Sequence, residues 1–381
     1  IGMNPNLKPE KTSSIEAGFE AAFWDNRLCL DFTYYKTDSR NQILKLATTA
    51  ASGYTSQVRN AGHIRNRGYE IQLGAVPIQT SKGFRWNLDL NYGANSSKVV
   101  KLDDEGLITS YQLYSSGIQI LASVGEAYGT LFGTSYVRDA NGNVVVDANG
   151  LPKISTTNKT LGKFTPDWTG GISNTFSYRS LSLSFLIDAS VGGSIFSNTN
   201  KTGKYTGVLA NTLSGRDAEH GGLWYYTAAM GNNVRLPESP SYSVSSDGLY
   251  YAQVNGQSTR VYQDGIMVEG VTESGSKNEE VVSAEKYYHR IYSIAEANVY
   301  DASYVKLREV ALSYRLPRLW TQKLHLQEAS VTLTGRNLWT IYKSVPNIDP
   351  ESALTTGNAQ GVEAYSLPTT RSFGVNLSVK F

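Results

Sequence analysis

Nine segments of about ten residues each alternate apolar with polar side chains, and this alternation constrains the fold more than any other feature of the sequence. A period of two places successive side chains on opposite faces of a β-strand. In one segment, Trp86, Leu88 and Leu90 alternate with Asn87 and Asp89. The segments are residues 15–23, 28–34, 69–75, 86–95, 172–178, 181–189, 304–316, 329–339 and 372–381. They predict an all-β protein whose antiparallel strands have one apolar and one polar face.

The alternation slips within two of the segments. Around residues 308–309 the apolar phase changes from Leu307 to Val310, and a similar break occurs at Asn337-Leu338. A β-bulge, which inserts one extra residue into a strand, would absorb such a slip. The sequence leaves open which face points outward at these two places.

The connections between the segments alternate strictly between short and long. Short connections lie at residues 24–27, near 77–83, at 179–180 and near 317–328, and long ones at 39–67, 98–167, 192–301 and 341–370. Bacterial outer-membrane barrels have short periplasmic turns and long extracellular loops. The spacing therefore predicts a transmembrane β-barrel with its long loops outside the cell.

The parity of the strands predicts their direction. The first strand ends in a short turn and the last follows a long loop, so both run toward the periplasm. Bacterial barrels have an even number of strands with both ends in the periplasm. We therefore expect nine C-terminal strands of a larger barrel. The sequence also opens without a charged and then apolar leader, so we interpret it as a fragment of the mature protein.

Composition narrows the function classes. Lys and Arg total 35 against 33 Asp and Glu, a net charge of +2, which gives no electrostatic reason to expect nucleic acid as a partner. No apolar run is long enough for a membrane-spanning helix. The single Cys29 excludes a disulfide framework within the chain, and the four scattered histidines make a metal site improbable. We expect no cofactor and no metal.

Aromatic residues gather at both ends of the predicted strands. Trp24, Phe84 and Trp320 fall near short turns, whereas Tyr34, Tyr35, Trp168 and Trp339 fall near long loops. This distribution resembles the two aromatic girdles of a membrane barrel. The alternative is that these rings pack in the core of a soluble β-protein.

One long loop carries a duplicated turn motif. Asp139-Ala140-Asn141-Gly142 recurs as residues 147–150, on either side of Val144-Val145-Val146. Asn-Gly is a strong hairpin signal, so a small β-ribbon is predicted here. A calcium loop starting at Asp139 would need an acidic twelfth residue, and that position is Gly150.

Several motifs carry a family resemblance. The last strand alternates Phe373, Val375, Leu377, Val379 and Phe381, which resembles the C-terminal signal read by the outer-membrane insertion machinery. Residues 4–10 and 14–20 resemble a late-barrel motif of TonB-dependent receptors. Residues 60–62, 66–70, 301–310, 335–338, 349–351 and 367–368 are similar to the SusC/RagA branch of that family. The similarity runs in order from about residue 4 to residue 381.

The resemblance implies a barrel of about 22 strands with an N-terminal plug domain, in the outer membrane of a Gram-negative bacterium of the Bacteroidetes. It implies a SusD-like surface lipoprotein that closes over the barrel, and periplasmic TonB energised by ExbB–ExbD. The substrates it implies are oligosaccharides or peptides. The plug and the N-terminal strands are not in this sequence, so this chain alone is not expected to perform coupled transport.

Two groups of residues are candidate sites. The inward face is predicted to carry Glu16, Glu20, Glu70, Gln72, Asn87 and Asp89, which line the import path or, as we prefer, contact the plug. The long loops carry aromatic and charged clusters suited to a sugar or peptide, with Trp224, Tyr225, Tyr226, Tyr287, Tyr288 and Arg290 as candidate substrate contacts. The alternative is that these clusters pack the loop against the lipoprotein or the barrel rim.

Catalytic and metal-binding interpretations are weaker. Glu16 and Glu20 could form a carboxylate pair, but such pairs are ordinary in polar barrels, and no enzyme is predicted. Asp217, Glu219 and His220 lack the spacing of metal ligands. Two rival functions remain: a passive or specific porin, and a soluble extracellular β-sandwich that binds glycans as an adhesin.

Overall fold

The computed structural model describes residues 4–47, 53–54, 56–103, 106, 108–323 and 325–381. Parts of two predicted long loops, residues 48–52 and 55 in the first and residues 104, 105 and 107 in the second, lie outside the described residues. Residue 324 in the last predicted short connection does too. Among the described residues, the helices are all too short or too polar to cross a membrane.

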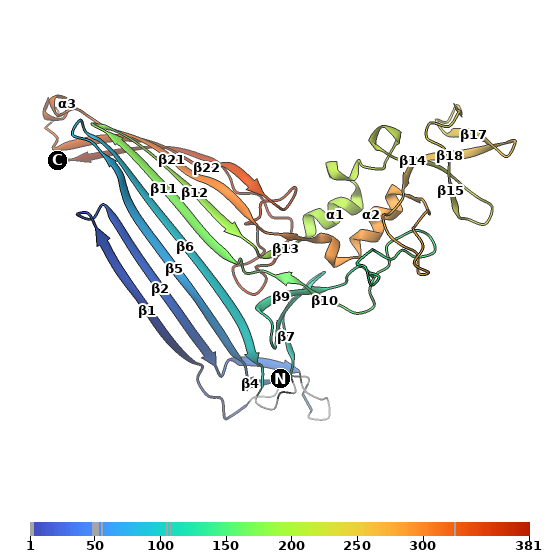
Figure 1. Cartoon of the computed structure of the whole chain (residues 1–381), viewed down its shortest axis with the longest axis horizontal. Helices are drawn as coiled ribbons and strands as arrows, with labels where there is room; N and C mark the ends of the chain where they lie inside the picture. The colour runs from blue at the N-terminus through green and yellow to red at the C-terminus, as the bar shows by residue number, and fades with distance from the viewer. Residues whose placement is uncertain (1–3, 48–52, 55, 104–105, 107, 324) are drawn as a thin grey trace.

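One antiparallel sheet of nine strands dominates the structure (Figure 1). Each strand pairs with the next along the chain among those that belong to this sheet. The strands are β1 (Lys11–Phe23), β2 (Leu28–Arg40), β5 (His63–Gln79), β6 (Phe84–Lys101), β11 (Trp168–Tyr178), β12 (Leu181–Val191), β21 (Tyr304–Arg315), β22 (Glu328–Lys343) and β24 (Ser372–Lys380). All nine predicted segments are confirmed as strands of one sheet.

The strands extend further toward the long loops than the alternation predicted. β5 starts at His63 and β6 reaches Lys101, inside residue ranges that were expected to be loop. The extensions carry polar residues on both faces, such as Arg65, Asn66 and Ser97. Backbone pairing continues there without the apolar period that marked the rest of the strand.

Short and long connections lie at opposite ends of the sheet, as predicted. Figure 1 shows the short turns together with α3 (Arg318–Lys323) and the C-terminus at one end, and all the long connections at the other. In the turn after β1, Trp24, Asp25 and Asn26 all have positive φ, and the amide of Arg27 donates back to the carbonyl of Phe23 at 3.1 Å. Residues 24–27 thus form a tight turn that reverses the direction of the chain.

Both predicted bulges are present. Across from Leu186 and Ile187, β21 places Glu309 and Leu307, so Arg308 is the extra residue. On β22, Asn337 and Leu338 stand between the paired residues Arg336 and Trp339. The bulge keeps Leu307 and Val310 on the same face, because they pair with Ile187 and Phe185. This settles the face that the sequence left open.

The two faces of the sheet differ in polarity as the alternation requires. Along one row of partners, Glu20 pairs with Asp31, Asp31 with Gln72, and Gln72 with Asn91. The neighbouring row on the other face runs Phe19, Phe32, Ile71 and Tyr92. Apolar side chains on that face are exposed, with Phe373 at 80%. An apolar surface this open suits lipid and not water.

Aromatic side chains form ladders at both ends of the apolar face. Toward the loops, the ring of Tyr92 lies 5.9 Å from that of Tyr69 and 5.4 Å from that of Trp168. Toward the turns, Trp86 stacks on Phe176 at 5.6 Å. Tyr35 does not belong to the expected aromatic girdle. It pairs with Glu16 and Gly68 and therefore lies on the polar face, one residue out of phase with Tyr34.

The long connections fold into smaller sheets and helices beyond the end of the nine-stranded sheet. The small strands are β3 (Ile43–Ala47) with β4 (Ser56–Asn60); β7 (Ser110–Ser115), β8 (Gln119–Ser123), β9 (Tyr128–Gly133) and β10 (Lys159–Lys163); β13 (Ser194–Ser197), β20 (Val299–Asp301) and β23 (Val362–Glu363); and β14 (Leu223–Thr227), β15 (Asn233–Arg235), β16 (Tyr242–Val244), β17 (Tyr250–Val254), β18 (Gln257–Ile266) and β19 (Val282–Ser283). The helices are α1 (Asn198–Thr206) and α2 (Ala284–Tyr292), with short 3-10 turns η2 (Ala210–Thr212), η3 (Ala218–His220) and η4 (Ala295–Asn298).

The water-excluded core lies among these connections. Ile120, Leu131, Phe196 and Val362 are fully buried in one cluster, although they come from three different connections. The predicted β-ribbon is also present: the carboxylate of Asp139 accepts the amides of Asn141 and Asn143, and Arg138 pairs with Val144. The long connections are therefore folded and share a buried hydrophobic core.

Candidate functional site

The six residues predicted to face the lumen all lie on the polar face of the sheet. They come from three strands, with Glu16 and Glu20 on β1, Glu70 and Gln72 on β5, and Asn87 and Asp89 on β6. Glu20, Gln72 and Asp89 line one cavity of about 660 Å³ on this face, together with Asp31 of β2. A cavity therefore opens on the polar face of the sheet.

Acidic side chains gather on the part of the polar face that β1, β2, β5 and β6 form. Within the part of the chain that the structure describes, Glu16, Glu20, Asp31, Glu70 and Asp89 have no ion-pair partner. The neighbouring strands β11 and β12 carry small hydroxyl side chains on the same face, and Ser177 and Ser182 hydrogen bond across them at 3.2 Å. The polar face is therefore acidic on β1, β2, β5 and β6, whereas on β11 and β12 it carries mainly small, neutral side chains.

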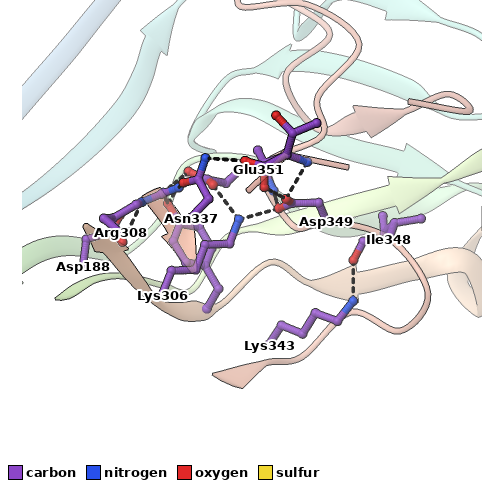
Figure 2. Close-up of polar contacts among 11 residues, drawn as sticks. Asp188, Lys306, Arg308, Asn337, Lys343, Ile348, Asp349 and Glu351 are labelled. Atoms are coloured by element: carbon purple, nitrogen blue, oxygen red, sulfur yellow. Dashed lines mark hydrogen bonds and ion pairs between the residues drawn. The ribbon is translucent and has the colours of Figure 1, made fainter. Parts of the chain in front are cut away.

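An ionic cluster lies at the loop end of the polar face (Figure 2). The ammonium of Lys306 on β21 donates to Asp349 Oδ1 and to Glu351 Oε2, both at 2.6 Å. Lys306 is 3% exposed and Asp349 is 9% exposed. Since buried charges are stable only when they are paired, these contacts fasten residues 349–351 to the sheet.

The bulge brings a second cation into the same cluster. Arg308 donates through Nε to Asp188 Oδ1 at 2.7 Å and through its other nitrogens to Glu351 and, at 3.5 Å, to Asn337. As the extra residue of β21, Arg308 has no ladder partner, which lets its side chain join that of Lys306. The two bulges on β21 and β22 thus meet through one hydrogen bond.

The electrostatics of the cluster favour its ionised form. Burial opposes the charge of Asp349, but hydrogen bonds from Lys306 and Thr369 outweigh it and hold the pKa of Asp349 at about 2. Burial likewise opposes the charge of Glu351, and hydrogen bonds from Arg308 and Lys306 hold its pKa below the usual range. Every charged side chain here is neutralised by a neighbour, so the cluster holds the connection on the sheet.

A set of hydrogen bonds to Glu363 joins the same connection, residues 344–371, to α1. The carboxylate of Glu363, fully buried, accepts the hydroxyl of Ser197 at 2.7 Å, the hydroxyl of Thr199 at 2.6 Å and the amide of Ser366 at 3.0 Å. It also accepts the amide of Thr199 in the first turn of α1 at 3.2 Å, where a negative charge is favourable. Residues 344–371 therefore bridge the sheet and the helical part of the loops.

The six candidate substrate residues separate into two places. Tyr287 and Tyr288 of α2 line a cavity of about 740 Å³, named here the loop cavity, between the 102–167 and 192–303 connections. Arg290 points elsewhere and donates to the carbonyl of Pro152 and the carboxylate of Asp147, both at 3.0 Å.

The other three candidates lie on β14. Trp224 packs against Ala252 and Val261 and is buried, and Tyr226 packs against the same cluster. Tyr225 is also buried and donates to Asp264 at 3.1 Å. Burial, and next the charge of Asp264, raises the pKa of Tyr225. All three side chains therefore pack within their own connection.

The residues of the ionic cluster and Glu363 were not among the candidate site residues predicted from the sequence. Lys306, Arg308 and residues 349–351 were noticed only as motifs of a resemblance, and Glu363 was not noticed at all. The phase slip at residues 308–309 was the available signal, because a bulge next to two basic residues redirects one of them.

The comparisons with known proteins agree with this architecture. A family model described as TonB dependent receptor-like, beta-barrel matches residues 1–338. TonB-dependent receptor P3 of Formosa agariphila is 27% identical over 99% of this chain and 35% of its own length. TonB-dependent receptor SusC of Bacteroides thetaiotaomicron is 28% identical over 57% of this chain and 23% of its own length.

A solved structure agrees as well. The RagAB peptide transporter matches with a TM-score of 0.62 at 20% identity, covering 99% of this chain and 36% of the compared chain. At that identity the match shows the fold. The chain spans about a third of the length of the curated relatives that match nearly all of it.

Proposed function

This chain belongs to the family of TonB-dependent receptor β-barrels, and from that membership we propose that it forms part of the wall and the outer loops of a nutrient importer in the outer membrane of a Gram-negative bacterium of the Bacteroidetes. The observation that carries the proposal is the nine-stranded sheet itself. It combines an exposed apolar face, a polar face with a cavity and long connections that all leave from one end.

The sheet is proposed to continue into further strands of the same barrel. β1 and β24 are its edges, and within the described residues each pairs on one side only. Unpaired edges of long strands bind other strands readily, and closing a barrel removes them. The alternating residues from Phe373 to Phe381 are proposed to be the insertion signal, so deleting Phe381 should lower the amount of protein in the outer membrane.

The acidic part of the polar face is proposed to contact a plug domain. The carboxylates of this face are largely exposed and unpaired, so they are free to accept hydrogen bonds from cationic or other donor groups of a plug seated in the barrel. A plug pulled by TonB, which is energised by ExbB–ExbD, would open the path. A SusD-like lipoprotein over the loops and a cargo of oligosaccharide or peptide complete the proposal.

Neutralising carboxylates of the polar face separates plug contact from cargo contact. Glu20→Gln combined with Asp89→Asn should loosen the plug and make cells more permeable to vancomycin, which is too large for ordinary porins. Ser184→Ala on the same face is the control. Slower uptake without added permeability would instead assign these residues to cargo.

The assembly is tested by purification from outer membranes in mild detergent, followed by mass spectrometry of every chain. The proposal expects a plug-bearing part of the transporter and a surface lipoprotein. Barrel strands without a plug would favour a porin. A chain that is soluble and monomeric without detergent would favour the adhesin.

A further inference from the structure

Two cavities in the loops meet at one lysine. Lys204 of α1 lines the loop cavity and also a smaller cavity of about 350 Å³ that lies between α1 and α2. Tyr288 lines both as well. Lys204 and Tyr288 therefore form part of the wall of both cavities.

Lys204 is a buried cation without a counter-ion. It is 9% exposed, and among the residues that the structure describes no carboxylate forms an ion pair with it. Its ammonium donates to the carbonyl of Ala297 at 2.8 Å and to Asn298 Oδ1 at 3.3 Å. An ammonium has three hydrogens, so one remains for a further acceptor.

Buried charges in proteins are normally paired, because removing an ammonium from water carries a large free-energy cost. The contrast with Lys306 is direct, since that equally buried lysine has two carboxylates. Burial alone lowers the pKa of Lys204 to about 8. An anionic ligand at this point would supply the missing charge.

The walls of the loop cavity indicate what is attached to the anion. Besides the tyrosines they carry the apolar side chains of Leu223, Ile266, Met267, Val268 and Ile291 and the polar side chains of Asn211, Ser214 and Glu269. Walls of mixed polarity suit a peptide, which has apolar side chains and a polar backbone. About 740 Å³ is within the usual range for a site that encloses a small ligand.

We propose that the loop cavity binds short peptides and that Lys204 receives their C-terminal carboxylate. This inference deepens the proposed function, because the peptide would be the cargo or a part of it. The phenol of Tyr288 already donates to the carbonyls of Asn211 and Ser214, at 3.1 and 3.0 Å, so it holds the wall while Lys204 makes the charged contact.

The test compares two ligands on two variants of the full-length transporter, purified from outer membranes in mild detergent. Random tetrapeptides with free C-termini, and the same mixture amidated at the C-terminus, are brought to equilibrium dialysis and quantified by mass spectrometry. Wild type is expected to bind the free peptides about tenfold to a hundredfold more tightly, as for a hydrogen bond between charged groups. Lys204→Met should bind both mixtures equally weakly.

Lys201→Met is the matched control. Lys201 lies on the same helix, but its ammonium sits 4.3 Å from the ring centre of Tyr292 and it lines neither cavity. This variant should keep the preference for free C-termini, which would show that losing a lysine from α1 is not enough to abolish it. Equal binding of both mixtures by wild type, or an unchanged preference in Lys204→Met, would overturn the inference.

Oligogalacturonate provides a third ligand with carboxylates. If Lys204→Met weakens its binding while peptides do not bind, the peptide assignment is wrong. Cargo uptake by cells is measured separately. Intact uptake with no effect of Lys204 would refute this site alone, whereas a transporter purified without plug or lipoprotein would refute the proposed function.

Discussion

Replacing Lys306 with Met tests whether the ionic cluster holds the last long connection on the sheet. Met has a similar length but no charge, so the variant leaves Asp349 and Glu351 buried without their shared ammonium. Arg308 still reaches Glu351, and Thr369 still reaches Asp349. The loss therefore falls mainly on Asp349.

The magnitude follows from the pKa of Asp349. It lies at about 2 against an ordinary 3.8, and one unit corresponds to about 1.4 kcal/mol, so the ionised carboxylate gains about 2.5 kcal/mol in the folded protein. Lys306 supplies the largest favourable part. Local opening of residues 344–371 should become about 30- to 150-fold more frequent, which is about 2–3 kcal/mol.

Hydrogen exchange with mass spectrometry on the detergent-purified transporter measures this opening. The amide of Ser344, which donates to Ser303 at 3.0 Å, and that of Leu354, which donates to Val362 at 2.7 Å, are suitable reporters. Both should exchange faster in Lys306→Met, while amides of β11 and β12 keep their rates. Adding Asp349→Asn should restore part of the protection, since it removes the unpaired charge.

Lys343→Met is the matched control. Lys343 binds the same connection, but through one hydrogen bond of 2.7 Å to the neutral carbonyl of Ile348 (Figure 2). The donor is charged but Lys343 is exposed to water, which weakens the bond to about 0.5–1.5 kcal/mol, so exchange should rise at most about tenfold. If Lys306→Met speeds exchange no more than Lys343→Met does, the cluster does not hold the connection, and the reasoning from burial and charge is refuted.

Three further predictions follow from the same structure. The carboxylate of Glu363 accepts four hydrogen bonds, and Glu363→Gln replaces one of its two oxygens with an NH2 group that cannot accept them. The start of α1 should be destabilised by about 1–3 kcal/mol, seen as faster hydrogen exchange in residues 197–206. Unchanged exchange would show that the buried carboxylate is dispensable. Trp86→Phe removes the 3.0 Å hydrogen bond from the indole to Asn174 on the apolar face and should lower the barrel's unfolding temperature in detergent, and adding Asn174→Leu should restore it. Because the pKa of Asp349 is depressed, its stabilising contribution is fully present above pH 4 and is lost as the pH falls through 2. Cleavage of residues 344–371 by pepsin, divided by the cleavage of an unfolded peptide of the same sequence at the same pH, should therefore rise between pH 4 and pH 2, and a flat ratio over that window would contradict the assignment.

The candidate sites were only partly predictable. Glu20, Gln72 and Asp89 could be placed on one face because the period of a strand sorts them without any tertiary information. The aromatic residues of the loops could not be sorted in this way. Trp224 and Tyr287 each belong to a short aromatic run, yet one packs inside a small sheet and the other lines a cavity.

The sequence by itself determined the number of strands in the main sheet, the face that side chains take outside the two bulges, the end at which the long connections lie and the positions of the bulges. These properties depend on residues that are close together along the chain, because alternation and its slips are read within one strand. Only the tertiary structure decided which charges meet. Lys306 binds Asp349 from 43 residues away, Arg308 binds Asp188 from 120 away, and Lys204 lies buried between cavities with no carboxylate beside it. Such meetings depend on how separate connections pack over the end of the sheet, which no local pattern records.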